Sequence, residues 1–420
     1  MEFSEKITNI AAQAEKELKK IFEEIDELSF YNTNRVLDSF REHKVSDAMF
    51  AGTSGYGYDD KGRDTLDEIY ADIFGCEKAL VRNGIVNGTH ALTIGLFGLL
   101  RPGDTLLSVA GKPYDTLDEV IGISGKNGDG SLADFGVSYR QIELKNGKLD
   151  LESIKAVLAS EKIKVVFVQR SKGYLDRRTL TVAEIGELVK VVKGISPETF
   201  VYVDNCYGEF TDKLEPTALG ADLCAGSLIK NIGGGMAETG AYLAGSARAV
   251  ELASYRMTSV GTGGEVGCTL GVNKNMYKGL FYAPHTTSQA LKTAHFAAYV
   301  FAKLGYIAEP AWNEPRADII QTVKTGSAEA LCALCRGIQK GSPVDAFVTP
   351  EPWDMPGYSD RVIMAAGTFT QGSSIELSAD GPLREPYIAY LQGGLTFEAG
   401  KIGIMSAAEE MEKIKTEGTK

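Results

Sequence analysis

Hydrophobic and polar residues follow two different periods along the chain. Residues 1–48 carry apolar positions at helical spacing among charged ones, which predicts amphipathic helices. The stretch AGTSGYGYDDKGR, at 51–63, breaks this pattern with glycine and aromatic residues. We therefore expect a helical arm that ends in a loop over residues 1–63.

Helical and strand patterns alternate from about Asp64 to Leu270. The helical segments are DTLDEIYADIF (64–74), THALTIGLFGLL (89–100), LDLESIKAVLAS (149–160) and TVAEIGELVKVVK (181–193). The short apolar strands are KALVR (78–82), KVVFVQR (164–170) and TFVYVD (199–204). Thr181 and Glu184 form a capping box at the start of one helix. This alternation predicts the α/β class, with a mainly parallel sheet covered on both faces.

A different pattern follows residue 275. A long helix is expected over 287–304, and a second helix over 329–339. VIMAAGTF (362–369) and IELSA (375–379) have the composition of strands. The chain thus divides into the arm, a large domain at 64–275 and a smaller α+β domain at 276–420.

Charge and composition exclude several classes of function. The net charge of −12 argues against a nucleic-acid partner, because nucleic acids are bound by clustered Lys and Arg. The first twenty residues lack the apolar run of a signal peptide, and the longest uncharged run, 83–100, is too polar for a membrane span. The six cysteines show no disulfide framework, so a cytoplasmic location is expected. Cys332 and Cys335 form a C-x-x-C motif, but their helical setting predicts buried apolar positions and no metal site.

Three segments place reactive residues where an open α/β sheet binds ligands, beyond the carboxyl ends of its strands. Asp204 ends an apolar strand in VYVDNCYGEF. Lys230 follows another short apolar run in DLCAGSLIKNIGGG. Gly88 and Thr89 stand at a helix start, where free N–H groups and the helix dipole favour an anion.

These groups match the needs of a pyridoxal-5'-phosphate (PLP) site. A lysine amine attaches the cofactor, a carboxylate keeps the pyridine nitrogen protonated, and a helix start with hydroxyls holds the phosphate. Ser227, three residues before Lys230, suits the hydroxyl role. Taken alone, each of these residues would be read as an ordinary helix cap or surface charge. The hypothesis of a PLP site rests on the order in which they follow one another along the chain. The competing phosphate motifs G-x-G-x-x-G and G-x-x-x-x-G-K-[ST] are not found in the required places.

The sequence resembles the PLP-dependent cysteine/methionine-metabolism superfamily, and within it the cystathionine β-lyase-like family associated with aluminium resistance, which is related to methionine γ-lyase. The matching segments include YGYDDKGRDTLDEIYADIFG, LVRNGIVNGTHAL, VQRSKGY, VDNCYGEF, AGSLIKNIGGG and GTFTQGSSIELSADGPLREPY. The resemblance implies the aspartate-aminotransferase-like fold (PLP fold type I). It further implies Lys230 as the Schiff-base lysine, Asp204 as partner of the pyridine nitrogen, and Gly88, Thr89 and Ser227 as phosphate ligands.

The same resemblance gives roles to three tyrosines. Tyr114, in GKPYDTLDEV, matches the aromatic residue that stacks on the cofactor ring. Tyr56 and Tyr58 lie where the superfamily has a Tyr-x-Arg motif that reaches the phosphate of a neighbouring subunit. Tyr58 occupies the place of the arginine, and Arg63 is five residues further on, which leaves the group that makes this contact open. A homodimer or homotetramer with shared active sites is implied.

Two further sets of charged residues are candidates. Arg384, in ADGPLREPY, falls where the superfamily places the arginine that binds the substrate carboxylate, and Arg361 is the competitor. VQRSKGY replaces the superfamily's Glu-x-Pro-x-Asn-Pro segment, and the roles of Arg170, Ser171 and Lys172 stay unassigned.

The reaction implied is elimination across the C–S bond of a sulfur amino acid of the cystathionine, cysteine or methionine type. The products would be a 2-oxo acid, ammonia and a thiol. Transamination, aldol cleavage or γ-replacement is the first alternative, because the cofactor performs the electronic work in all of them. A non-catalytic PLP-binding protein is the second. The residues do not distinguish β- from γ-elimination.

Overall fold

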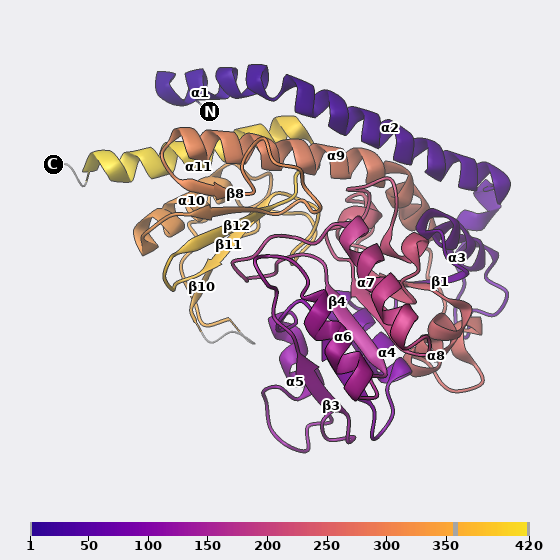
Figure 1. Cartoon of the computed structure of the whole chain (residues 1–420). Coiled ribbons are helices and arrows are strands. Elements are labelled where there is room, and N and C mark those ends of the chain that lie inside the picture. The colour runs from indigo at the N-terminus through magenta and orange to yellow at the C-terminus, as the bar shows by residue number, and fades with distance from the viewer. Residues whose placement is uncertain (1, 356–359, 418–420) are drawn as a thin grey trace. The chain divides into compact units, whose positions relative to one another are not determined.

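The computed structural model describes residues 2–355 and 360–417 (Figure 1). Contacts between Cα atoms divide the chain into two compact units: Asn34–Phe281, and Met1–Thr33 together with Tyr282–Lys420. We call them the larger and the smaller unit. They run differently from the predicted domain ranges, because the first helix of the chain groups with the carboxy-terminal part and not with the loop at 51–63.

The larger unit is built on a seven-stranded sheet within the described residues, in the order β1-β7-β6-β5-β4-β2-β3. β7 runs antiparallel to β1 and β6, and the other pairs are parallel. The mainly parallel sheet that the sequence predicts is therefore confirmed. The strands are β1 (Lys78–Arg82), β2 (Thr105–Ser108), β3 (Ser138–Gln141), β4 (Val165–Gln169), β5 (Phe200–Asp204), β6 (Leu223–Ser227) and β7 (Ala241–Gly245).

Both faces of this sheet are covered, since β4 is buried at every position and β5 at all but its first. On one face the apolar side chains of α4 and α8 form a core with those of β2, β4, β6 and β7. The helices predicted from the sequence are present with small shifts at their ends. They are α3 (Lys61–Phe74), α4 (Gly88–Leu99), α6 (Leu151–Ser160) and α7 (Val182–Ile195), joined by α5 (Asp118–Ile121) and α8 (Ala247–Met257). Short 3-10 helices are η1 (Asp47–Phe50), η2 (Asp115–Leu117), η3 (Pro216–Leu219), η4 (Asn231–Gly233) and η5 (Gly263–Glu265).

The smaller unit has an antiparallel five-stranded sheet in its described part, in the order β10-β11-β12-β9-β8. Its strands are β8 (Ile307–Glu309), β9 (Gln321–Lys324), β10 (Val362–Ala365), β11 (Ser378–Pro382) and β12 (Ile388–Gln392). The strand predicted at 375–379 is thus displaced towards the carboxy terminus, and the one predicted at 362–369 ends early. The reason is local: the Glu376 side chain accepts hydrogen bonds from the amides of Phe369 and Thr370, which holds this connection in a loop.

Three helices pack together in the smaller unit: α1 (Glu5–Glu17), α10 (Ala328–Lys340) and α11 (Phe397–Glu417). In Figure 1, α1 lies along α11, and Ser4, the N-cap of α1, donates to Glu409 of α11 over 2.9 Å. Ile7, Ala11 and Ala14 enter the same core as α10 and α11. Cys332 and Cys335 are buried in this core, as the helical pattern predicts.

Two long helices run from one unit into the other along the chain, α2 (Lys19–Glu42) and α9 (Asn273–Lys303). α9 begins well before the predicted residue 287 and contains Pro284. A proline removes one backbone hydrogen bond, and buried residues on both sides of it, including Tyr277 and Leu291, keep the helix packed. No helix in the described ranges has the length and apolar character needed to cross a membrane.

Candidate active site

Asp204 and Lys230 lie at the carboxyl ends of neighbouring strands of the larger unit. Asp204 is the last residue of β5, and Lys230 follows β6 by three residues. The carboxylate oxygen Oδ1 of Asp204 accepts a hydrogen bond from the Cys206 amide over 3.1 Å. The Nζ atom of Lys230 lies 3.8 Å from the centroid of the Tyr207 ring. The sheet therefore brings together the amine and the carboxylate that the sequence singles out.

Both groups have shifted pKa values. Burial raises the pKa of Asp204 above its ordinary value, and Lys230 and the Cys206 amide act in the opposite direction. Burial acts to lower the pKa of Lys230, but Cys206, Tyr207 and Asp204 outweigh it and raise that pKa. A titratable pair whose charges respond to each other at the end of a sheet is typical of a functional site.

The start of α4 faces the end of β6. Asn87 caps this helix, and its Oδ1 accepts from the His90 amide over 2.8 Å. A Cβ atom on Gly88 would lie 3.3 Å from Cys206 Sγ and 3.5 Å from Ser227 Cβ, so glycine keeps this space open. Ser227 Oγ is buried and, among the described residues, has no hydrogen-bond partner. An unpartnered hydroxyl beside a helix start fits the chemistry of a phosphate ligand.

Thr89 and Tyr114 are linked through the segment that follows Tyr114. The Thr89 hydroxyl lies 2.8 Å from the hydroxyl of Thr116. Tyr114 is half-buried, and its ring centroid is 6.2 Å from that of Tyr174. A Cβ on Gly173 would lie 3.0 Å from the Tyr114 ring, so this glycine permits the close approach of the two loops. The hydrogen bond between the threonines ties the Tyr114 loop to the first turn of α4.

The three residues of VQRSKGY that sequence reasoning left unassigned are all buried. Arg170 donates to Asn205 Oδ1 over 2.8 Å and to the Gly208 carbonyl over 2.9 Å. It thus lies against the turn that follows Asp204. A charged residue at the end of a predicted strand gives no sequence signal of burial, and its partners Asn205 and Gly208 are distant along the chain.

The loop that carries Tyr56 and Tyr58 is exposed and firmly anchored. The two rings stack with centroids 5.5 Å apart, and 73% and 58% of their residue surfaces are exposed. Arg63 is buried and donates to the carbonyls of Gly57, over 2.6 Å, and Gly267, over 3.0 Å. Arg63, the alternative cation of this stretch, therefore holds its own loop in place, while the tyrosines point into solvent.

Arg384 and Arg361 both belong to the smaller unit. Arg384 Nη1 lies 3.0 Å from Asp360 Oδ2, and half of the Arg384 side chain is exposed. Arg361 donates to the carbonyl of Pro352. Part of the Arg384 guanidinium is thus exposed to solvent, and the Asp360 carboxylate orients it.

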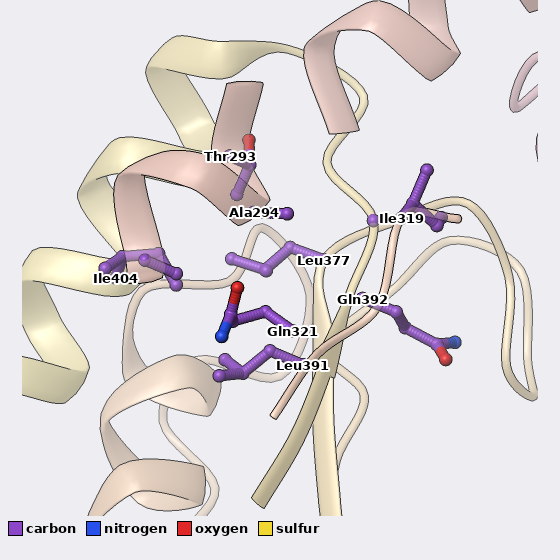
Figure 2. Close-up of a pocket in the computed structure, with 10 residues that line it drawn as sticks. Thr293, Ala294, Ile319, Gln321, Leu377, Leu391, Gln392 and Ile404 are labelled. Atoms are coloured by element: carbon purple, nitrogen blue, oxygen red, sulfur yellow. The ribbon is translucent and has the colours of Figure 1, made fainter. Parts of the chain in front are cut away.

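A pocket of about 10 Å³ inside the smaller unit is shown in Figure 2. Its lining is mostly apolar, and in this view the Gln321 side chain lies between those of Leu377 and Leu391. The Gln321 amide donates to Pro310 and Thr322 carbonyls. This volume is near the lower limit for a single water molecule, so the pocket is a packing feature and no substrate site. In the described part of the chain, no group of three or more His, Cys, Asp or Glu residues is arranged to hold a metal ion.

An α/β fold with a lysine and an aspartate at the carboxyl ends of adjacent strands is the arrangement of PLP-dependent enzymes. A PLP-dependent protein of Escherichia coli shares this fold with a TM-score of 0.61, at 17% identity over 91% of this chain and 96% of that one. The family model described as methionine gamma-lyase matches residues 7–412. The chain belongs to the methionine γ-lyase family.

Several relatives cover nearly the whole chain. Protein YnbB of Bacillus subtilis is 52% identical over 97% of both chains. The structure of a carbon-sulfur lyase involved in aluminium resistance from Clostridium novyi is 51% identical, covers 96% of each chain and has a TM-score of 0.93. A protein of Clostridium acetobutylicum that is also named for aluminium resistance is 48% identical, covers 97% of this chain and 96% of its own, and has a TM-score of 0.94.

Proposed function

We propose that this protein is a PLP-dependent carbon–sulfur lyase that acts on a sulfur amino acid. The observation that carries the proposal is the unpartnered Ser227 hydroxyl beside the α4 start, on the strand that leads to Lys230. The name of the Clostridium novyi relative, a carbon-sulfur lyase, supports the reaction class.

The residues present suit the cofactor. Gly88, Thr89 and Ser227 would hold the phosphate, because amides at a helix start and a hydroxyl are its usual partners. Asp204 would accept a hydrogen bond from the protonated pyridine nitrogen, and Tyr114 would cover the ring. Lys230 would attach the cofactor through Nζ. When bound, PLP supplies an electron sink that stabilises negative charge at the substrate Cα.

The chain's own groups then handle the protons. Lys230 Nζ would take the proton from Cα, and a neutral amine is required for that step. The carboxylate of Asp204 would keep a proton at the ring nitrogen, because a nearby negative charge favours the protonated form of the ring. Elimination breaks the C–S bond at Cβ, or at Cγ after a second proton transfer, and the thiol leaves. Arg384 would bind the substrate carboxylate through its paired N–H donors.

We further propose a symmetric dimer, or a tetramer built from it, with shared sites. The exposed Tyr56–Tyr58 pair would reach the phosphate of a neighbouring subunit, because the anchored loop presents both hydroxyls outward. A cytoplasmic location agrees with six cysteines that are all free.

The test is a product assay with cystathionine, cysteine and methionine as substrates. Purified protein with PLP should release a 2-oxo acid, ammonia and a thiol from at least one of them, and pyruvate or 2-oxobutyrate will show which carbon loses sulfur. Borohydride should fix the cofactor on Lys230, and Lys230→Ala should abolish both fixation and turnover. Asp204→Ala should bind PLP and lose roughly 30- to 1000-fold in rate. Amino-group transfer to a 2-oxo acid with no thiol released would replace the lyase proposal by an aminotransferase.

A further inference from the structure

The turn that follows Asp204 has an unusual backbone. Tyr207 and Phe210 both have positive φ angles, of 70° and 60°. Bulky residues rarely adopt this left-handed conformation, so neighbouring groups must hold the turn. The turn, residues 204–211, carries Asp204 at one end, and Cys206 and Tyr207 contact Asp204 and Lys230. Its shape therefore decides where the carboxylate and the amine meet.

Arg170 holds this turn along its whole length. Its backbone amide donates to the Asp204 carbonyl over 3.0 Å, at the start of the turn. Its guanidinium donates to Asn205 Oδ1 over 2.8 Å and to the Gly208 carbonyl over 2.9 Å, in the middle. At the end, Nη2 donates to Thr211 Oγ1 over 3.1 Å. The side chain is 1% exposed, so no water competes for these donors.

Glu215 completes the arrangement from the other side. Its carboxylate accepts from the Phe210 amide over 2.9 Å and from Asn205 Nδ2 over 2.9 Å. Glu215 Oε2 also lies 3.9 Å from Arg170 Nη1, which balances the buried charge. Glu215 thus holds Phe210, one of the two strained positions, while Arg170 holds Gly208 and Thr211 on either side of it. The guanidinium is required for this because its planar fork serves several acceptors at once, which a lysine ammonium cannot do with the same geometry.

We propose that Arg170 is a positioning residue that sets the place of Asp204 by fixing the 204–211 turn. Within the described residues, the Arg170 side chain donates its hydrogen bonds to Leu180, Asn205, Gly208 and Thr211, and to neither Lys230 nor the start of α4. It therefore acts through Asp204 and not on substrate. Its effect on the turn is independent of the cofactor; its effect on the reaction rests on the proposed function.

Gly208 offers a sharp way to displace the guanidinium without changing any charge. A Cβ at this position would lie 2.3 Å from Arg170 Nη1, and Gly208 is not among the glycines with positive φ, so alanine fits the backbone there. Gly186→Ala is the matched control, because its Cβ would lie 2.7 Å from Leu219 Cδ1 on the α7 side of the unit. Arg170→Lys and the double variant Arg170→Met/Glu215→Gln complete the set.

The first measurement is hydrogen–deuterium exchange of the turn in the protein without cofactor. Arg170→Lys and Gly208→Ala should speed exchange of the 204–211 amides by about tenfold or more, with little change at α7. Gly186→Ala should leave the turn as it is in the unsubstituted protein. The double variant removes both buried charges and keeps the protein testable if a single change prevents folding. Unchanged exchange at 204–211 in Gly208→Ala and in the double variant would overturn the proposal, whatever the protein's reaction is.

The second measurement uses the protein with saturating PLP. Displacement of Asp204 should lower kcat by about 10- to 100-fold, change the visible circular dichroism of the bound cofactor and leave KM within about threefold. A purely structural role would lower the unfolding temperature and leave kcat of the folded protein and its spectrum unchanged. That outcome would overturn the positioning role. Failure of the proposed function would appear differently, as absence of turnover in the unsubstituted protein.

Discussion

The ammonium nitrogen of Lys230 lies 3.8 Å from the centroid of the Tyr207 ring, against its face. A cation over an aromatic ring is stabilised by the ring's quadrupole. Tyr207 holds this place only because its backbone adopts a φ of 70°.

Tyr207→Leu should therefore lower the pKa of Lys230 in cofactor-free protein. The rate at which an amine-reactive reagent labels Lys230, followed against pH by peptide mass spectrometry, measures this pKa. Tyr207→Phe separates the two contributions of this residue, because it keeps a ring at the same position and removes the hydroxyl that also raises the pKa of Lys230. Equal pKa values in all three proteins would show that the ring does not interact with the amine.

Ser227→Ala tests the phosphate site through two opposite effects. The buried hydroxyl has no partner in the described part of the chain, so its removal should leave the cofactor-free protein equally stable or more stable by up to about 1 kcal/mol. The Kd for PLP should rise about 10- to 100-fold, because a hydrogen bond to a charged group is lost. Ser108→Ala is the matched control: Ser108 Oγ donates to the Gly111 carbonyl over 2.6 Å, so stability should fall by about 1 kcal/mol and the Kd should not change. An unaltered Kd in Ser227→Ala would remove this residue from the site.

Glu209 makes stability depend on pH. It is fully buried, accepts from the Tyr242 hydroxyl over 2.8 Å, and burial raises its pKa from 4.5 to about 8. The folded state therefore keeps a proton that the unfolded chain releases above pH 4.5, and stability is lost as the pH rises through about 8. The substituted side chain of Glu209→Gln cannot ionise, so the unfolding temperature of this variant should not fall with Glu209 ionisation. Measured relative to the unsubstituted protein, it should rise between about pH 5 and about pH 9. A constant difference over this range would mean that Glu209 is ionised in the folded protein.

Arg384→Ala should raise KM for the amino-acid substrate by about 30-fold or more, which corresponds to about 2 kcal/mol of a charged contact. The reason is loss of the donors that pair with the substrate carboxylate. Arg361→Ala is the control and should change KM little. A large rise in KM for Arg361→Ala, with none for Arg384→Ala, would exchange the two roles.

Shared sites can be tested by mixing subunits. Lys230→Ala and Tyr56→Ala/Tyr58→Ala should each be inactive, and hybrid dimers formed by exchange should regain part of the activity, because one of their two sites is intact. Arg63 stays unchanged in this test, since it anchors the loop that presents the tyrosines. Verified exchange without recovery, or a fully active monomer, would contradict shared sites.

The sequence predicts the strand that ends at Asp204, because it is a short apolar run that follows a helix. It also indicates a short apolar run before Lys230, which the structure shows as β6. It does not indicate β3, whose SYRQ sequence is largely exposed, or β7, a short run that contains glycine. The site shows the same division. Gly88, Asp204, Ser227 and Lys230 have recognisable places at the ends of elements, whereas the burial of Arg170 depends on Asn205, 35 residues away. Such contacts exist only after the sheet is assembled.

The pairing of α1 with α11 affects how the protein is made. On the ribosome the apolar face of α1, with Ile7, Ala11 and Ala14, emerges long before α11, the last helix that the structure describes. Until then the core that this face joins is incomplete, and the larger unit, most of whose residues come between the two helices along the chain, can fold first. A version of the gene that places α1 directly after α11, as a circular permutation, should shorten that interval and raise the yield of native protein.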